Sequence, residues 1–132
     1  MHLNSSRFGS LEIPDDAVVE FPSGLIGLGG SRYTLLAHGE NAEIVWLQSL
    51  DDPELALPVT NPWRHVPEYE LELTEQDAER IGLDDPASAS VYVTVRAIDG
   101  ISVNLRAPII ISGRHGHQVI NQAEKADVRV RI

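Results

Sequence analysis

The sequence predicts a mostly β, antiparallel fold in a single domain with one short helix. Many short runs of β-branched and aromatic residues are bounded by Gly, Pro, Asn or Asp, and only one run has helical character. Strands do not alternate with helices, as they would in a parallel sheet. A chain of 132 residues with 42% hydrophobic side chains is large enough to bury one core. We therefore expect residues 1–132 to form one domain, with the polar residues 1–6 disordered.

Five short strands are expected in the first half of the chain, at residues 7–13, 17–21, 33–37, 43–49 and 55–59. Turns rich in Pro, Gly and Asp separate them, because these residues favour turn conformations. The turn between the third and fourth strands falls on residues 38–41. Four glycines crowd into residues 24–30, but no helix and no P-loop lysine follow them. This loop is expected to need positive φ angles and not to bind phosphate.

The middle of the chain predicts one more strand and the only helix. Residues 69–73 alternate strictly, so the apolar side chains would face the core while Glu70 and Glu72 face solvent. Thr74 is placed to begin the helix, because its hydroxyl can accept from a backbone N–H in the first turn, where acidic residues are also favoured. Gly82 is expected to end it.

The second half of the chain predicts a hairpin and three closing strands. Residues 90–98 form the clearest strand pattern, and Asp99-Gly100 is a strong tight-turn pair. The chain then returns through further strands at residues 102–106, 109–111, 118–121 and 128–132. The run at 109–111 is apolar on both faces, which indicates a strand that is covered on both sides.

Charge is the strongest compositional feature. The net charge is −10, and residues 51–85 hold eleven acidic residues against two arginines, a local net charge of −9. Residues 96–132 hold six basic and three acidic residues, a net of +3. An acidic field repels nucleic acids and favours a basic protein partner. The simpler interpretation is a solvated acidic face that keeps the protein soluble.

The sequence contains no signal for a disulfide, a membrane span or export. Cysteine is absent, which is compatible with a reducing compartment. No apolar run approaches the ~20 residues of a membrane helix, and the N-terminus lacks a basic region followed by an apolar one. We therefore expect a cytoplasmic protein.

Residues that could carry chemistry are few. His115 and His117 are two residues apart, a spacing that would put both on the same side of a strand, and His65 is elsewhere in the chain. No further cluster of ligands lies nearby in sequence, so an exposed histidine loop is a better interpretation than a metal site. No Gly-x-Ser-x-Gly elbow indicates a nucleophile. The Glu70 and Glu72 pair marks a surface better than a catalytic cleft. We predict no catalytic residue, no metal and no cofactor.

Two tryptophans are candidates for the core or for a partner. Trp46 lies within an apolar strand and is expected in the core. Trp63 follows Asn61-Pro62 in a turn, where an exposed aromatic ring could contact a partner.

Several motifs resemble those of the FliW family of bacterial flagellar assembly factors. The longest is WLQSLDDPELALPVTNP at residues 46–62, and the others follow in the same order along the chain. They are Phe8-Gly9 with Leu11-Glu12-Ile13, FPSGLIG at 21–27, VNLRAPIII at 103–111 and QVI at 118–120. Ile26 stands where the family commonly has proline, and residues 126–129 lack an aromatic residue expected there.

The resemblance implies a compact, barrel-like version of the β fold and a protein that is not an enzyme. It implies binding to the RNA-binding translational repressor CsrA, which frees flagellin messenger, and binding to flagellin, so that flagellin translation follows secretion. Charge, and not the family motifs, selects the residues that we expect at a partner: Asp51, Asp52, Glu54, Glu68, Glu70, Glu72, Glu75 and Asp77, with Trp63 as an aromatic contact. Flagellin helices would need an apolar groove, for which the candidates are Leu55, Leu57, Val59 and Trp63.

Two alternatives come from other classes of protein. One is a small β-barrel enzyme or ligand-binding protein with a pocket near His65 or His115. The other is a structural subunit that dimerises through the edges of its strands.

Overall fold

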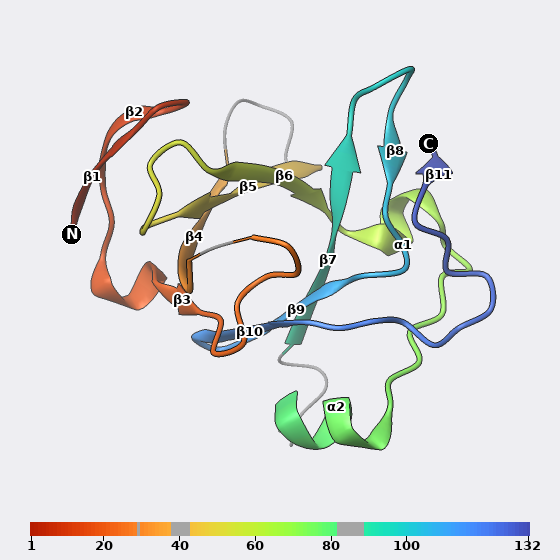
Figure 1. Cartoon of the computed structure of the whole chain (residues 1–132). Helices are drawn as coiled ribbons and strands as arrows, with labels where there is room; N and C mark the ends of the chain where they lie inside the picture. Colours follow the sequence, from red (N-terminus) through yellow and green to blue (C-terminus); the bar gives the residue numbers. More distant parts are fainter. Residues whose placement is uncertain (29, 38–42, 82–88) are drawn as a thin grey trace.

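In the computed structural model, which describes residues 1–28, 30–37, 43–81 and 89–132, most strands belong to one curved sheet (Figure 1). Its order is β11-β8-β7-β6-β5-β4-β3-β10-β9, and β7 pairs with β9 as well as with β6, so the sheet curls on itself. The predicted mostly β, barrel-like single domain is confirmed. The strands of this sheet are β3 (Val19–Glu20), β4 (Arg32–Ala37), β5 (Ile44–Ser49), β6 (Ala56–Thr60), β7 (Ala89–Arg96), β8 (Ser102–Val103), β9 (Ile109–Ser112), β10 (His115–Gln118) and β11 (Val130–Arg131).

The core lies inside this curl and is built from the inward side chains of the strands. Phe21, Tyr33, Leu47 and Ile109 are each at most 1% exposed, and the rings of Phe21 and Tyr33 meet edge to face with centroids 5.3 Å apart. Gly116 allows β10 to cross directly over the Phe21 ring, because a Cβ at that position would lie 2.4 Å from it.

The expectation that residues 1–6 are disordered is wrong. His2–Ser5 forms β1, which pairs antiparallel with β2 (Gly9–Glu12) as a separate two-stranded sheet. Leu3 is buried in a small cluster with Ile13, and the Ser5 hydroxyl donates to the buried Oε1 of Gln48 at 2.8 Å. These partners are distant in sequence, so the local polarity of the first residues gave no sign of them.

The hairpin and most strand predictions are confirmed. Asp99 and Gly100 both have positive φ, 55° and 99°, but they lie in a longer loop, residues 97–101, and not in the predicted tight turn, since the last residues that pair across the hairpin are Arg96 and Ser102. The closing strands lie differently from their predicted positions, because β10 is His115–Gln118 and not 118–121, and β11 covers only Val130–Arg131. The predicted turn at 38–41 lies outside the described residues.

The helical part is slightly larger than predicted. α2 (Glu75–Ile81) is the expected helix, and the Thr74 hydroxyl accepts from Asp77 N at 3.1 Å. Gly82, its predicted end, lies outside the described residues. The chain also forms a 3-10 turn, η1 (Asp15–Ala17), and a one-turn helix, α1 (Pro62–His65). No helix in the described ranges is long and apolar enough to cross a membrane.

Residues 69–73 follow the predicted burial pattern but do not form a strand. Tyr69 is buried, Leu71 and Leu73 are partly buried, and the two glutamates between them are exposed. The backbone of this segment bonds instead to residues 121–122: Glu72 O accepts from Gln122 N at 2.9 Å, and Glu72 N donates to the Asn121 side chain. An amide side chain therefore takes the place of a neighbouring strand.

Candidate protein-binding surface

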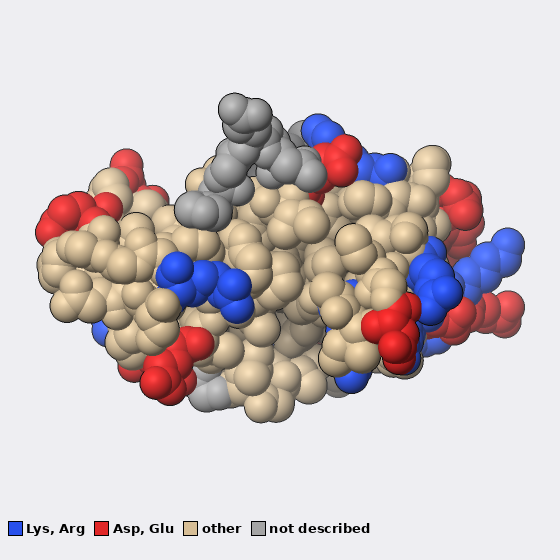
Figure 2. Space-filling view, turned by 90° about the horizontal axis from the view of Figure 1, so that it is seen from above, with Lys and Arg blue, Asp and Glu red and all other residues tan. Residues whose placement is uncertain are grey.

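The acidic segment of the sequence does not form one surface. The turn between β5 and β6 lies beside β1 and β2, whereas residues 66–74, which we call the acidic ribbon, lie at the other end of the sheet near β8 and β11, and α2 projects below (Figure 1). In Figure 2 the acidic side chains form several separate groups, most of them next to Lys or Arg. Asp84 and Asp85 lie outside the described residues. The predicted partner residues are thus divided: Asp51, Asp52 and Glu54 in the turn, Trp63 in α1, Glu68, Glu70 and Glu72 in the ribbon, and Glu75 and Asp77 in α2.

In the β5–β6 turn the carboxylates hold the backbone. Asp51 Oδ2 accepts from Ser31 N at 2.9 Å and Arg32 N at 3.1 Å, and its Oδ1 pairs with Arg32 Nη2 at 3.0 Å. Hydrogen bonding from Ser31, together with Arg32, lowers the pKa of Asp51. Asp52 Oδ1 accepts from Glu54 N at 3.0 Å. Both carboxylates therefore already accept hydrogen bonds within the chain, and that of Asp51 is also paired with an arginine.

In α2 one acidic residue is also neutralised within the chain. Asp77 Oδ1 pairs with Arg80 Nη2 at 3.1 Å, an i, i+3 contact on the helix surface. Glu75 is exposed in the first turn, where the helix dipole favours a negative charge. Helix α2 therefore keeps Glu75 and Glu79 as exposed carboxylates that belong to no ion pair in the described ranges, while Asp77 is neutralised.

The acidic ribbon is the part in which all the predicted partner carboxylates remain available. Glu68, Glu70 and Glu72 are all exposed, and none of the ion pairs within the described ranges involves them. No hydrogen bond of their carboxylates is found among the described residues either, so they add negative potential to the surface without a role in holding the fold.

Asn121 fixes the ribbon to the body of the protein. The side chain is 0% exposed, and its Oδ1 accepts from Glu72 N at 2.9 Å and Ala123 N at 3.1 Å. Its Nδ2 donates to the Tyr69 hydroxyl at 3.0 Å and to Glu70 O at 2.8 Å. A single amide thus satisfies both donors and acceptors of an irregular segment that has no strand partner.

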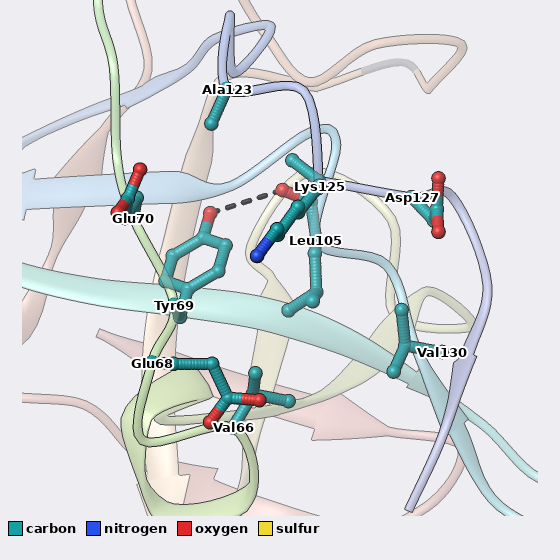
Figure 3. A pocket seen from close by; sticks show the side chains of 10 residues that line it. Val66, Glu68, Tyr69, Glu70, Leu105, Ala123, Lys125, Asp127 and Val130 are labelled. Carbon is teal, nitrogen blue, oxygen red and sulfur yellow. Dashed lines mark hydrogen bonds between the residues drawn. The ribbon is translucent and has the colours of Figure 1, made fainter.

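A pocket of about 290 Å³ lies between the ribbon and the C-terminal segment (Figure 3). Tyr69 forms one wall, and its hydroxyl donates to Leu105 O at 3.0 Å. Burial raises the pKa of Tyr69, so the phenol keeps its proton at neutral pH. Lys125 points across the pocket toward Tyr69 (Figure 3). Apolar walls and a charged rim suit a side chain with an apolar stem; the charged lining residues are Glu68, Glu70, Lys125 and Asp127.

Trp63 lies at the edge of the ribbon and is 39% exposed. Its Nε1 donates to Tyr69 O at 2.8 Å, and the two rings meet edge to face with centroids 5.4 Å apart. This geometry fixes the indole while leaving part of it in solvent. The other predicted groove residues are not available: Val59 is 1% exposed, and Leu55 and Leu57 pack against the core cluster.

The histidines do not converge on one site. His65 lies in α1, with its Nε2 3.1 Å from Thr60 Oγ1 of β6, whereas His115 and His117 line a separate hollow with Arg80. The expectation that the latter two form an exposed loop is wrong for His117, which is 8% exposed in β10 with its Nδ1 unpartnered. Burial, and then Arg80, lower the pKa of His117. Among the described residues no group of three or more His, Cys, Asp or Glu could hold a metal.

No pattern in the sequence points to Asn121 or Lys125, the two residues that complete this surface around Tyr69. Asn121 follows a family-like motif but looks like any polar loop residue, and Lys125 lies in a segment with weak periodicity. Only their contacts with a segment about 50 residues earlier, such as that between Asn121 and Glu70, reveal their role.

Comparison with known proteins covers almost the whole chain. The family model described as FliW protein matches residues 2–132. A protein of Azoarcus sp. (strain BH72) named flagellar assembly factor FliW is 35% identical over 143 residues, 99% of this chain and 98% of its own. A protein of the same name from Alkaliphilus metalliredigens (strain QYMF) is 30% identical, over 94% of this chain and 81% of its own. A crystal structure of the flagellar assembly factor FliW superposes with a TM-score of 0.89 at 26% identity, over 99% of this chain and 96% of that one.

Proposed function

Because the chain belongs to the FliW family, we propose that it is a non-enzymatic flagellar assembly factor that binds a CsrA-type RNA-binding protein and flagellin. Both partners are proteins that the family resemblance implies. Acting in the cytoplasm, it would release flagellin messenger from the repressor and respond to unsecreted flagellin. Flagellin translation would then follow flagellin export.

The observation that carries the CsrA part is the unneutralised charge of the acidic ribbon. A protein that holds RNA presents lysine and arginine to phosphates. The ribbon presents three exposed carboxylates on one segment, those of Glu68, Glu70 and Glu72. Such carboxylates can pair with the lysines and arginines of a basic surface. Complementary charge speeds encounter and favours the correct partner. RNA, being negatively charged, would be repelled from the same face.

The ribbon is also held in one conformation, which favours binding. Asn121 fixes its backbone at both Glu70 and Glu72. A segment that is ordered before binding loses little conformational entropy on binding. We therefore assign the main contact to Glu68, Glu70 and Glu72, with Trp63 beside them. The remaining predicted residues, Asp51, Asp52, Glu54, Glu75 and Asp77, would add only to the long-range field.

Charge reversal in the ribbon tests this assignment. The variant Glu68→Lys/Glu70→Lys should bind a purified CsrA-type protein about tenfold or more weakly in isothermal titration calorimetry, because two attractive contacts become repulsive. Affinity of the unaltered protein should also fall as salt is raised.

The matched control is Asp15→Lys/Asp16→Lys in η1, away from the ribbon, which changes the net charge by the same amount. It should retain most of the affinity. Equal losses in both variants, or no loss in either, would contradict the ribbon assignment.

Co-elution of the unaltered protein with monomeric flagellin on a sizing column tests the second partner. Absence of a complex with either protein would remove the proposed function itself.

A further inference from the structure

The hairpin between β7 and β8, together with residues 128–132, has a chemistry opposite to that of the ribbon. We call this surface the arginine end. Four apolar side chains are exposed on it: Ile98 (52%), Ile101 (45%), Val128 (67%) and Ile132 (41%). They are interleaved with three exposed arginines, Arg96, Arg129 and Arg131.

Two of these arginines are held in place by hydrogen bonds that leave their charge unpaired. Arg129 Nη2 donates to Ile98 O at 3.0 Å, and Arg131 Nη2 donates to Asp99 O at 2.6 Å. Both partners are backbone carbonyls, and no ion pair within the described ranges includes Arg96, Arg129 or Arg131. The guanidinium groups of Arg129 and Arg131 are therefore positioned by the fold, and none of the three arginines has a carboxylate partner within the described ranges.

A hollow of about 330 Å³ opens between these elements. Arg96 and Arg129 line it with the hydroxyl residues Thr94 and Ser102 and the exposed side chain of Val128, and no acidic residue is part of its lining. Guanidinium and hydroxyl donors around a cavity without a carboxylate favour an anionic group. The exposed isoleucines nearby favour an apolar group next to that anion.

The edge of the sheet adds backbone groups to this surface. β11 is the last strand in the sheet order of the described residues. Its Val130 faces Val103, and Ile132 N donates to Ile101 O at 2.9 Å. In an antiparallel pair the intervening residue directs its N–H and C=O outward. Arg131 therefore presents both a backbone edge and a cationic side chain to a partner.

We propose that the arginine end binds an acidic segment of another protein, in which carboxylates alternate with apolar side chains. A carboxylate would enter the hollow between Arg96 and Arg129, and apolar neighbours would cover Ile98 and Ile101. A short segment is favoured over RNA or an anionic membrane, because an extended polyanion would also meet the field of a chain with net charge −10. The assignment does not depend on CsrA binding at the ribbon.

The test uses a short fluorescein-labelled peptide in which leucine alternates with glutamate, followed by fluorescence anisotropy. The full chain should bind it, and Arg96→Gln/Arg129→Gln should weaken binding about tenfold, since two charge-assisted contacts are lost. The matched control, Arg64→Gln/Arg114→Gln, removes the same charge at exposed arginines elsewhere and should bind as the unaltered chain does. Thermal unfolding followed by circular dichroism should show that both variants fold.

Several results would overturn the proposal. They are no binding of the peptide, an equal loss in the control variant, or equal binding of a peptide in which serine replaces leucine. Tighter binding of a single-stranded RNA, or of phosphatidylcholine vesicles containing phosphatidylserine, would assign the surface to a different class of partner. Dimerisation in light scattering that the Arg96→Gln/Arg129→Gln variant abolishes would assign it to a second copy of this chain.

Discussion

Two acidic regions that are close in sequence have opposite relations between charge and fold. In the β5–β6 turn the carboxylate of Asp51 accepts the hydrogen bonds that hold the chain, and Arg32 neutralises it. In the acidic ribbon the carboxylates of Glu68 and Glu70 make no hydrogen bond to the chain among the described residues. The amide of Asn121, from a distant segment, binds the ribbon backbone instead. Acidic residues that look alike in a sequence can therefore be part of the fold or available to a partner.

The two regions nevertheless share one device, a buried amide that replaces missing strand contacts. Gln48 is 0% exposed, and its Nε2 donates to Ser49 O at 2.9 Å and Leu55 O at 3.1 Å across the turn. Asn121 serves the ribbon in the same way. The difference is that a carboxylate also holds the backbone in the turn, whereas none of the ribbon's own carboxylates does so among the described residues.

Removing the amide from the ribbon should have the largest effect. Asn121→Ala leaves Glu72 N, Ala123 N and Glu70 O without their buried partner. We expect the free energy of unfolding in urea to fall by about 3 kcal/mol, since unsatisfied buried polar groups are costly. The control Gln122→Ala, at an exposed neighbour, should change it by less than about 0.5 kcal/mol. A loss of similar size in the two variants would show that Asn121 is not what distinguishes the ribbon.

Patterns within the chain predict the regular part of this fold well. Runs of apolar and β-branched residues bounded by turn residues locate β4, β5 and β6, alternation locates β7, and the Asp99-Gly100 pair locates the hairpin, because these signals depend on residues that are adjacent in sequence. Alternation also predicts which side chains of residues 69–73 face inward. It cannot predict what their backbone bonds to, since Asn121 is 49 residues from Glu72.

The same limit applies to the candidate site. Counting charges identifies the acidic part of the chain and hence the sign of a partner. It does not reveal that Arg32 neutralises Asp51 or that Arg80 neutralises Asp77, because such pairs require the folded chain. The arginine end is a further case: Arg96, Arg129 and the hairpin come together only when β8 pairs with β11.

An intermediate effect is expected in the turn. Asp51→Asn weakens the contacts with Ser31 and Arg32, and should lower the free energy of unfolding by about 1 kcal/mol at neutral pH after allowance for solvent screening at this partly exposed group. The pKa of Asp51 is lower in the folded protein than in the unfolded chain, where an aspartate has a pKa of about 3.9. The contribution of the Asp51 charge to stability is therefore complete above that unfolded value and is lost as pH falls through the folded value.

Urea unfolding across acidic pH measures this linkage. The difference between Asp51→Asn and the unaltered chain should shrink as pH falls below about 4. Asp16→Asn, at an exposed position in η1, is the matched control and should show no such trend. A difference that stays constant down to acid pH would mean that the Asp51 charge is as inert for the fold as the charges of the ribbon.

The smallest effect on stability should come from the ribbon carboxylates themselves. Glu68→Gln/Glu70→Gln keeps the size of both side chains and removes only charge, and neither carboxylate has a partner within the described ranges. The free energy of unfolding should change by less than about 0.5 kcal/mol, while affinity for a basic partner falls. A loss above about 1 kcal/mol would place these charges with Asp51 as part of the fold. Unchanged stability with weaker binding would instead mean that the ribbon keeps its charge for a partner, because its shape is maintained by contacts such as those of Asn121 and Gln122, and not by its carboxylates.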